Sequence, residues 1–203
     1  MVQTTVRMAV VVLAAGSSRR MHSENKLLSI WRGKALLRRV AEQALKSNAV
    51  SVYVITGYEA NRVASLLADM PVTLIHNQDY KSGMAGSLNL GISSLDANTD
   101  GVLVCLGDMP QVTSKAMNAL IAAYCPNREL DVCIPTHHGQ RGNPILIGRR
   151  FFSLLTDLQG DIGARQLIRE NPNRVVEVPV NHPGILLDID TPESLSRLRK
   201  KEP

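Results

Sequence analysis

The fold of this chain is decided by the stretch Met8–Met21, which reads MAVVVLAAGSSRRM. Its first seven residues, Met8–Ala14, are all apolar, which is typical of a strand buried on both faces of a parallel sheet. A turn of small residues follows the strand, and two arginines come directly after the turn. Because ligands of open α/β sheets bind beyond the carboxyl ends of such strands, this stretch predicts the sheet and also its ligand-binding edge.

Strand-like and helix-like segments alternate along the rest of the chain. The pattern predicts strands over Val50–Ile55, Val72–His76, Gly101–Leu106, Val132–Pro135, Pro144–Ile147, Val175–Val178 and Ile185–Leu187. It predicts helices over Leu36–Leu45, Ala60–Ala68, Met84–Leu95, Ser114–Ala123, Phe151–Leu155, Gly163–Arg169 and Glu193–Lys200, and a long loop over His137–Asn143. This alternation indicates an α/β fold: one Rossmann-like domain over residues 1–203, with a mostly parallel sheet and helices on both faces.

The composition favours a small-molecule ligand over nucleic acid or a membrane. Hydrophobic residues make up 44% of the 203 residues and aromatic residues only 3%, so aliphatic side chains must build the core. The formal net charge is +5, but the basic residues are not interleaved with the aromatics that nucleic-acid-binding surfaces use. The charge therefore indicates a small polyanionic substrate. No apolar run approaches the roughly 18–20 residues that span a bilayer, and no signal peptide is evident, so we expect a cytoplasmic protein.

The cysteines and histidines do not predict a metal site or a covalent mechanism. Cys105, Cys125 and Cys133 form no CxxC pair, and the apolar runs around Cys105 and Cys133 favour buried thiols. His137 and His138 are adjacent, so they cannot share one face of a strand or helix, and we interpret them as part of a solvated loop. No Ser-His-Asp or Cys-His set has a spacing that suggests a nucleophile and its base.

The loop after the first strand has the features of a phosphate-binding turn. Gly16 and its small neighbours let backbone N–H groups come close to a ligand. Arg20 and Lys26 are suited to neutralise a triphosphate, the arginine by forked hydrogen bonds and the lysine as a point charge. Neither GxxxxGK[ST] nor GxGxxG is present, which excludes a P-loop and a dinucleotide-binding turn. The alternative is an ordinary strand-to-helix turn with two solvated arginines.

Two later loops carry carboxylates directly after predicted strands. Asp108 follows Gly101–Leu106 and Asp190 follows Ile185–Leu187, and carboxylates are ligands that Mg²⁺ prefers. We expect these loops and the loop over 16–26 to open toward one cleft, because they follow strands of one sheet. Asp188 is expected to share a strand face with Asp190, so that either carboxylate completes the metal site.

Both carboxylates also have a purely structural interpretation. Asp108 could serve the turn that leads into the predicted helix at Ser114 and cap that helix. Asp190 or Thr191 is a good N-cap for the last helix, with Pro192 at its first position. For Asp190 the capping role and the metal role are compatible.

The string LAAG-x-S-x-R-M at residues 13–21, followed by Lys26, resembles the signature loop of the NTP-transferase family. Further strings resemble the molybdenum cofactor branch of that family: VITGY at 54–58, HNQDY at 76–80, GMAGSL at 83–88, GDMP at 107–110, GNPIL at 142–146, GDIGAR at 160–165 and DIDTP at 188–192. Together they extend from about Val10 to about Leu198, nearly the whole chain. The chain departs from the family at His22, where the family usually has glycine.

The resemblance implies a nucleotidyltransferase that transfers CMP from CTP to the phosphate of molybdenum-loaded molybdopterin, with Mg²⁺ or Mn²⁺ as cofactor. CTP is favoured because guanylyltransferase relatives carry LAGG where this chain has LAAG, and the methyl group of Ala15 changes the room near the base. A client molybdoenzyme of the oxidase or dehydrogenase type is implied as a partner. The half up to about residue 110 is expected to bind the NTP, and the half from about 111 to bind the acceptor.

The resemblance also implies which residues form the site. Catalysis is expected from Arg20, Lys26 and Asp108, and metal binding from Asp108 and Asp190. The nucleotide-binding residues it implies are Leu13, Ala14, Ala15, Gly16, Ser17, Ser18, Arg20, Lys26, Gly57, Gly83, Met84, Gly86 and Ser87, and the acceptor-binding residues are Gly142, Asn143, Pro144, Asp161 and Arg165.

Three other functions remain open at this point. A transferase with another base or acceptor, such as a guanylyltransferase or a sugar-phosphate enzyme, would use the same loops. A carrier of the pterin cofactor without turnover has no need for Arg20, Lys26 and Asp108 together. An oxidoreductase is considered because some family relatives have that label, but the absence of a GxGxxG turn argues against it.

Overall fold

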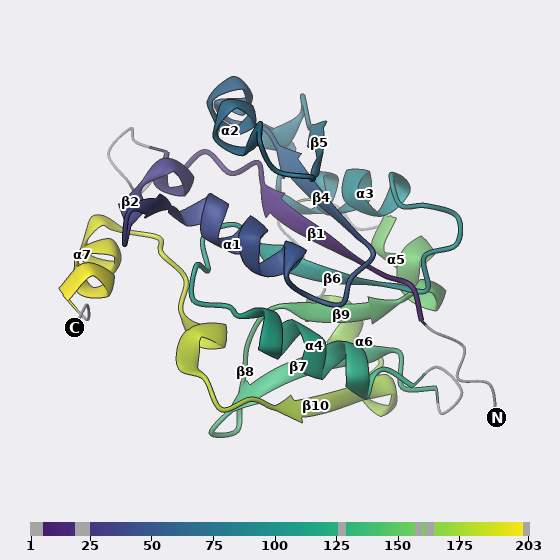
Figure 1. The fold of residues 1–203 in the computed structure, drawn as a ribbon. Helices are drawn as coiled ribbons and strands as arrows, with labels where there is room; N and C mark the ends of the chain where they lie inside the picture. The colour runs from purple at the N-terminus through teal and green to yellow at the C-terminus, as the bar shows by residue number, and fades with distance from the viewer. Residues whose placement is uncertain (1–5, 19–24, 126–128, 157–159, 161–164, 201–203) are drawn as a thin grey trace.

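A single mixed sheet forms the centre of the protein (Figure 1). The computed structural model describes residues 6–18, 25–125, 129–156, 160 and 165–200. The eight-stranded sheet has the order β10-β7-β9-β6-β1-β4-β5, and β8 pairs with β7. The strands are β1 (Met8–Ala14), β4 (Ser51–Thr56), β5 (Thr73–His76), β6 (Gly101–Leu106), β7 (Val132–His137), β8 (Gln140–Arg141), β9 (Ile145–Gly148) and β10 (Val175–Pro179).

Strand β1 lies in the middle of this sheet and is parallel to both of its neighbours, β4 and β6. Strands β4 and β5 are also parallel, as are β7 and β10, whereas β9 runs antiparallel between β6 and β7. The predicted mostly parallel α/β sheet is therefore confirmed. The uninterrupted apolar sequence of β1 follows from this position, because such a strand is covered on both faces.

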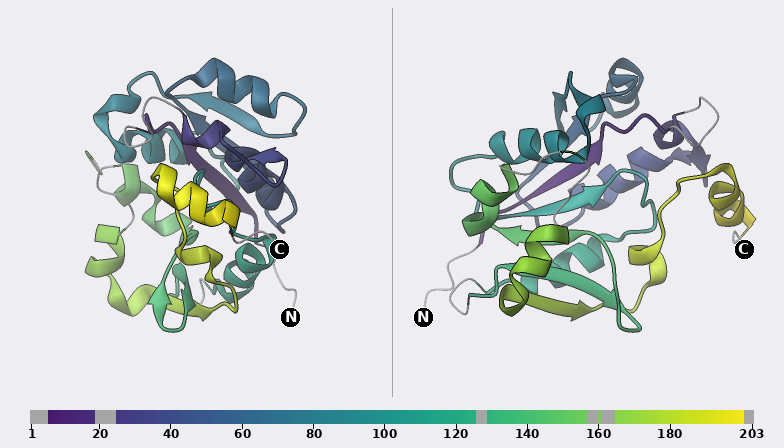
Figure 2. Two further views of the ribbon diagram at one scale, coloured as in Figure 1. Left: turned by 90° about the vertical axis from the view of Figure 1, so that its left-hand side faces the viewer. Right: turned by 180° about the vertical axis from the view of Figure 1, so that it is seen from behind.

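Helices cover both faces of the sheet (Figure 2). On one face α1 (Leu36–Leu45), α2 (Ala60–Leu67) and α4 (Ser114–Ala123) pack on Met8, Val10 and Val12 of β1. On the other face α3 (Met84–Ser93), α5 (Phe152–Thr156) and α6 (Arg165–Glu170) pack on Ala9 and Val11. Alternate residues of one strand thus serve two separate clusters of buried side chains.

A short hairpin and the last helix form a small additional cluster beside the sheet. Strands β2 (Ile30–Trp31) and β3 (Lys34–Ala35) pair antiparallel, and α7 (Pro192–Lys200) packs against them through Leu195 and Leu198. The two turn residues of the hairpin, Arg32 and Gly33, both have positive φ, at 47° and 74°. Positive φ at both positions is the geometry that suits a two-residue hairpin. This hairpin was not predicted from the sequence.

The sequence-based expectations are wrong in two segments. The expected long loop over His137–Asn143 instead contains a tight turn, because β7 continues to His137 and β8 pairs back on it. The expected strand over Ile185–Leu187 is a 3₁₀ helix, Pro183–Leu186, whose first turn is held by the bond from the Gly184 N–H to Nδ1 of His182. A proline at the start fixes φ and suits a helical turn better than a strand.

In the described part of the chain, the other 3₁₀ helices are short connections: Lys26–Leu28, Tyr80–Ser82, Arg149–Phe151 and Pro172–Arg174. Across the described part of the chain, no helix is both long enough and apolar enough to cross a membrane.

Candidate functional site

The loops that carry the predicted site residues gather at one edge of the sheet. Strands β1, β4, β5, β6 and β7 end at this edge, because they run in one direction; it is the left-hand edge in Figure 1. Strand β9 runs the opposite way, so the residues Asn143 and Pro144 that precede it lie at the same edge. Both the predicted nucleotide loops and the predicted acceptor loop therefore reach this edge of the sheet.

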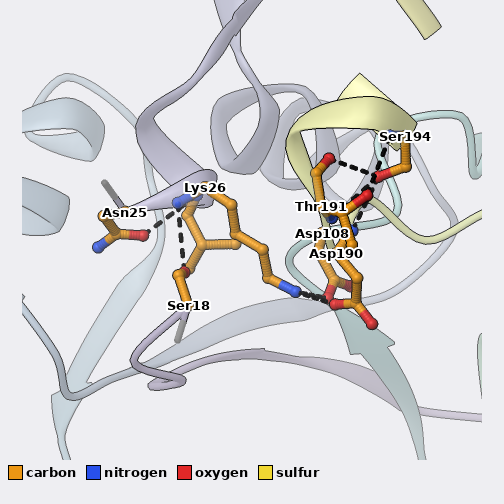
Figure 3. Close-up of polar contacts among 8 residues, drawn as sticks. Ser18, Asn25, Lys26, Asp108, Asp190, Thr191 and Ser194 are labelled. Carbon is orange, nitrogen blue, oxygen red and sulfur yellow. Dashed lines mark hydrogen bonds and ion pairs between the residues drawn. The ribbon is translucent and has the colours of Figure 1, made fainter. Parts of the chain in front are cut away.

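Three charged side chains from distant parts of the chain meet at this edge (Figure 3). The Nζ atom of Lys26 lies 2.6 Å from Oδ2 of Asp108 and 2.5 Å from Oδ1 of Asp190. The three side chains are largely buried, with exposed fractions of 14%, 17% and 25% for Lys26, Asp108 and Asp190. The prediction that the loops after β1 and β6 and the loop over 188–191 converge is thus confirmed for their described residues.

The backbone around Lys26 is held by side chains of the same loop. Asn25, which is 3% exposed, caps the short helix that begins at Lys26 by accepting the N–H of Leu27 at 3.1 Å. The hydroxyl of Ser18 accepts the N–H of Lys26 at 3.2 Å. The lysine therefore enters the site from a fixed backbone, and its side chain is the adjustable part.

Asp190 is held in place by the start of α7. Thr191 is the N-cap, since its Oγ1 accepts the N–H of Ser194 at 3.2 Å. In return, the hydroxyl of Ser194 accepts the N–H groups of Asp190 and Thr191, both at 3.1 Å. This reciprocal cap leaves the carboxylate of Asp190 available for Lys26. Of the two residues considered for the cap, Thr191 has that role.

The backbone of Asp108 is linked directly to the loop of Asp190. Its carbonyl accepts the N–H of Ile189 at 3.0 Å, and the Ile189 side chain is only 3% exposed. The alternative capping role of Asp108 is wrong, because Thr113 caps α4 by accepting the N–H of Ala116. Residues 187–190 form no strand, so the expected strand face shared by Asp188 and Asp190 is wrong as well.

Among the described residues of the site, negative charge is in excess. Burial is the largest influence on the pKa of Asp108 and raises it; together with the charges of Asp190 and Asp188 it outweighs the nearby ammonium of Lys26, which lowers this pKa. Burial lowers the pKa of Lys26, but attraction and hydrogen bonds from Asp108 and Asp190 outweigh burial and raise it. One ammonium thus faces two carboxylates directly and a third at longer range, which favours a further cation.

One oxygen of Asp108 points to the same conclusion. Its Oδ1 is buried and has no hydrogen-bond partner among the residues that the structure describes. Buried polar atoms are normally paired, so this carboxylate oxygen is suited to bind a cation. In the described part of the chain no group of three or more His, Cys, Asp or Glu side chains forms a metal cage. Two carboxylates are nevertheless the donor set that suits Mg²⁺, which completes its shell with water and substrate phosphates.

The nucleotide loop begins at the buried end of β1 and becomes exposed at its tip. Ala15 is 5% exposed and its carbonyl accepts the N–H of Tyr58 at 3.1 Å, whereas Gly16 is exposed with nothing near its Cβ direction. Gly57 fits tightly beside this loop. A Cβ on Gly57 would lie 2.5 Å from that of Tyr80 and 2.8 Å from that of Ala15. The glycine at 57 is therefore required by close packing of the two loops.

The segment over residues 83–87 opens α3 at the same edge. Gly83 has φ 117°, a conformation that favours glycine, and it is the N-cap position without a side-chain hydrogen bond. Met84 is 42% exposed, but Ser87 is only 4% exposed and its hydroxyl accepts a bond from Nδ2 of Asn77. Ser87 thus holds α3 to the loop after β5.

The predicted acceptor residues are only partly described. A Cβ on Gly142 would collide with the carbonyl oxygen of Ile185, so close packing explains why a glycine stands at this position. The N–H of Asn143 donates to the same carbonyl at 2.9 Å. Arg165 begins α6, but its side chain lies outside the described residues. Also outside them are Arg20 and Asp161, which were predicted for the site, and His22, where the chain departs from the family.

Sequence reasoning missed three polar residues that organise the site: Asn25, Asn77 and Ser194. Asn77 is 7% exposed, donates to Ser87 and accepts the N–H of Asp79 at 3.0 Å. Ser194 could have been found from the string Thr191-Pro192-Glu193-Ser194, since an N-cap is paired with the residue three positions later. For Asn25 and Asn77, the sequence holds no feature that indicates a role in the site, apart from their position in predicted loops.

The histidines and cysteines have structural roles. His137 donates from Nδ1 to the carbonyl of Val180 at 2.9 Å, so it is partly buried and not simply solvated. Cys105 and Cys133 are buried, as predicted, at 2% and 0% exposure.

Comparison with known proteins agrees with this geometry. The model of the MobA-like NTP transferase domain matches residues 10–175. The chain is 27% identical to nicotine blue oxidoreductase of Paenarthrobacter nicotinovorans, covering 93% of this chain and 94% of that protein. It is 26% identical to molybdenum cofactor cytidylyltransferase of Escherichia coli, covering 94% and 95%.

A solved structure of Rv0371c from Mycobacterium tuberculosis is also similar. It superposes with a TM-score of 0.85 at 26% identity and covers 98% of this chain and all of that chain. A structure of Rv0371c in complex with manganese has a TM-score of 0.81 at 23% identity, over 97% of this chain and 100% of that one, so this second likeness concerns the fold.

Proposed function

This chain belongs to the MobA-like NTP transferase family and is a nucleotidyltransferase; we propose that it transfers CMP from CTP to the phosphate of molybdenum-loaded molybdopterin and releases pyrophosphate. Mg²⁺ is the proposed cofactor. The observation that carries the proposal is the meeting of Lys26, Asp108 and Asp190, with one buried carboxylate oxygen left unpaired, at the edge where the family motifs converge.

These residues suit phosphoryl chemistry that depends on charge and position. The acceptor phosphate oxygen forms a bond to the α-phosphorus, and the bond from that phosphorus to the bridging oxygen of pyrophosphate breaks. A phosphate monoester is already anionic at neutral pH, so no strong general base is required. A divalent cation bound here would offset charge on phosphate oxygens. Asp108 and Asp190 are proposed to hold it, whereas Lys26 and Arg20 neutralise and orient the triphosphate.

The choice of base and acceptor is supported by the sequence and by one relative. The family strings at residues 54–192 resemble the molybdenum cofactor branch over nearly the whole chain. The molybdenum cofactor cytidylyltransferase of Escherichia coli is similar over 94% of this chain. The LAAG form of the first loop supports CTP rather than GTP. We assign the loop residues Leu13, Ala14, Ala15, Gly16, Ser17, Ser18, Gly57, Gly83, Met84, Gly86 and Ser87 to the nucleotide side, and Gly142, Asn143, Pro144, Asp161 and Arg165 to the acceptor side.

The test is pyrophosphate release from CTP, GTP, ATP and UTP, each with Mg²⁺ and molybdenum-loaded molybdopterin. We expect release with CTP, and a loss of about 100-fold or more in Asp108→Asn, because a site that stabilises transition-state charge loses about that factor with one charged partner. Asp69→Asn is the matched control: it makes the same chemical change at a carboxylate that is 68% exposed and pairs with Arg38.

Each other outcome selects a different function. Release with GTP alone keeps the reaction and overturns the proposed base. Tight binding of molybdopterin without release from any nucleotide indicates a carrier. Oxidation of NAD(P)H without pyrophosphate release would assign this chain to the chemistry named for the Paenarthrobacter relative.

A further inference from the structure

The position of Lys26 between Asp108 and Asp190 indicates how the negative charge of this site is balanced when no metal is bound. The ammonium lies 2.6 Å from one carboxylate and 2.5 Å from the other, so a single cation bridges both. Without it, two carboxylates in a largely buried site would repel each other. The lysine is therefore the internal counter-ion of the two proposed metal ligands.

The carboxylates do not depend on Lys26 for their backbone positions. The loop of Asp190 is held by the cap from Ser194, and the Ile189 N–H donates to the carbonyl of Asp108. The Lys26 backbone is held separately, through Ser18 and the cap from Asn25. Only the four-carbon stem of the lysine needs to move for the ammonium to leave, because the backbones of both aspartates are held by other bonds.

From this arrangement we propose that Lys26 is an exchangeable resident cation: its ammonium bridges Asp108 and Asp190 in the metal-free protein, and a divalent metal displaces it from them. The displacement frees the ammonium to move toward the triphosphate, where the proposed function places it. Only this movement toward the triphosphate rests on the proposed function. The unpaired Oδ1 of Asp108 gives the incoming metal a first ligand before the ammonium has left. A doubly charged ion with oxygen ligands then competes effectively with one ammonium.

The inference predicts that Lys26 lowers the metal affinity of the nucleotide-free protein. We would titrate wild type and Lys26→Met with Mn²⁺ by isothermal titration calorimetry, without nucleotide or acceptor. The variant is expected to bind Mn²⁺ about tenfold or more tightly, because the competing cation is gone and two carboxylates face each other. An affinity no higher than that of wild type, including no binding by either protein, overturns the inference.

A matched control separates competition at the site from the change in overall charge. Lys34→Met also removes one ammonium, and this lysine forms an exposed pair with Glu42, at 2.7 Å from Nζ to Oε1. We expect its Mn²⁺ affinity to equal that of wild type. An equal gain in Lys34→Met would show that net charge alone is responsible, and the inference would fail.

A second measurement needs no folded variant. In the metal-free wild type, the ammonium of Lys26 should give a slowly exchanging ¹H–¹⁵N signal, because it is buried and hydrogen-bonded twice. Saturation with Mg²⁺ should remove that signal, whereas a signal that persists in the Mg²⁺-saturated protein contradicts the exchange. The transferase assay on wild type is independent: absence of CTP turnover refutes the proposed function without changing either metal-binding result.

Discussion

Asp108 combines burial with a partner on one oxygen only. Its Oδ2 pairs with Lys26, whereas its Oδ1 is buried without a hydrogen bond. A residue selected for stability alone would normally have both oxygens satisfied or exposed to water. The same imbalance occurs at Asp131, whose Oδ2 pairs with Arg174, so the feature that distinguishes Asp108 is the second carboxylate, Asp190, on the same ammonium.

At Gly57 a substitution should cost stability through packing rather than through backbone strain. In Gly57→Ala the new methyl group would lie 2.5 Å from Cβ of Tyr80 and 2.8 Å from Cβ of Ala15. Overpacking of this kind typically costs about 1–3 kcal/mol, which urea denaturation can measure. Gly16→Ala is the control, since nothing lies within 4 Å of its Cβ direction, and it should be close to neutral. Equal stabilities of the two variants would contradict this packing.

The thiols should differ in reactivity. Burial raises the pKa of Cys105 to about 12, and burial together with Asp131 raises the pKa of Cys133 to about 12. A raised thiol pKa means that the reactive thiolate forms only as the pH approaches this value, so at pH 8 both thiols remain protonated. Cys125 is partly exposed. Titration with a thiol reagent at pH 8 should modify Cys125 alone in the native protein and all three cysteines after unfolding; fast modification of Cys105 would contradict it.

At the level of elements, the start of α7 decides where one proposed metal ligand lies. Ser194 accepts two backbone N–H groups, one of them from Asp190 itself. The helix is anchored on the hairpin through Leu195 and Leu198, in the cluster that also holds Trp31. The hairpin and α7, which lie far apart in the sequence, thus cooperate to place the loop over 188–191.

Replacement of Ser194 should therefore affect both stability and metal binding. Ser194→Ala removes the hydroxyl half of the reciprocal cap, whereas the backbone N–H of residue 194 can still donate to Thr191; loss of a capping side chain costs about 1 kcal/mol. Because the bond to the Asp190 backbone is lost as well, Mn²⁺ affinity should fall by about tenfold, which is in the range for residues that orient metal ligands. Ser196→Ala changes an exposed serine of the same helix and should leave both quantities unchanged. Loss of stability without loss of affinity would limit Ser194 to capping.

At the level of the whole molecule, one sheet joins the two predicted halves. Strand β6 belongs to the first half and β9 to the second, and they pair over Val102–Ile147 and the neighbouring positions. The buried clusters on both faces include side chains from before and after residue 110. The division into a nucleotide half and an acceptor half is therefore a proposal about binding and not about independent folding units.

This continuity predicts cooperative unfolding. The single tryptophan, Trp31, lies in the small cluster beside the sheet and is 8% exposed. In urea, the transition followed by Trp31 fluorescence should coincide with the transition followed by far-UV circular dichroism, since a single domain unfolds in one step. An earlier fluorescence transition would mean that the hairpin and α7 unfold separately from the sheet.

Elements with a strong local pattern could be predicted accurately. The bounds of β1, α1, β6 and α4 agree with the expected ranges, because the two strands are uninterrupted apolar runs and the two helices repeat apolar residues at the helical spacing. The hairpin around Trp31 and the 3₁₀ helix at Pro183 were missed, since a strand of two residues or a single turn has no measurable period. Their conformations depend on particular turn residues and on contacts with distant segments.

The sequence by itself determined the succession of strands and helices along the chain, the family motifs and the residue types at the ligand-binding edge. Periodicity and glycine-containing loops are local properties, and they are sufficient for those conclusions. Only the tertiary structure decided that the ammonium of Lys26 bridges Asp108 and Asp190, the latter 164 positions away in the sequence, and that Asp188 stands outside this direct pairing. The physical reason is that a pairing of charges across the sheet edge depends on which strands are neighbours and on burial, and neither is encoded in a local pattern.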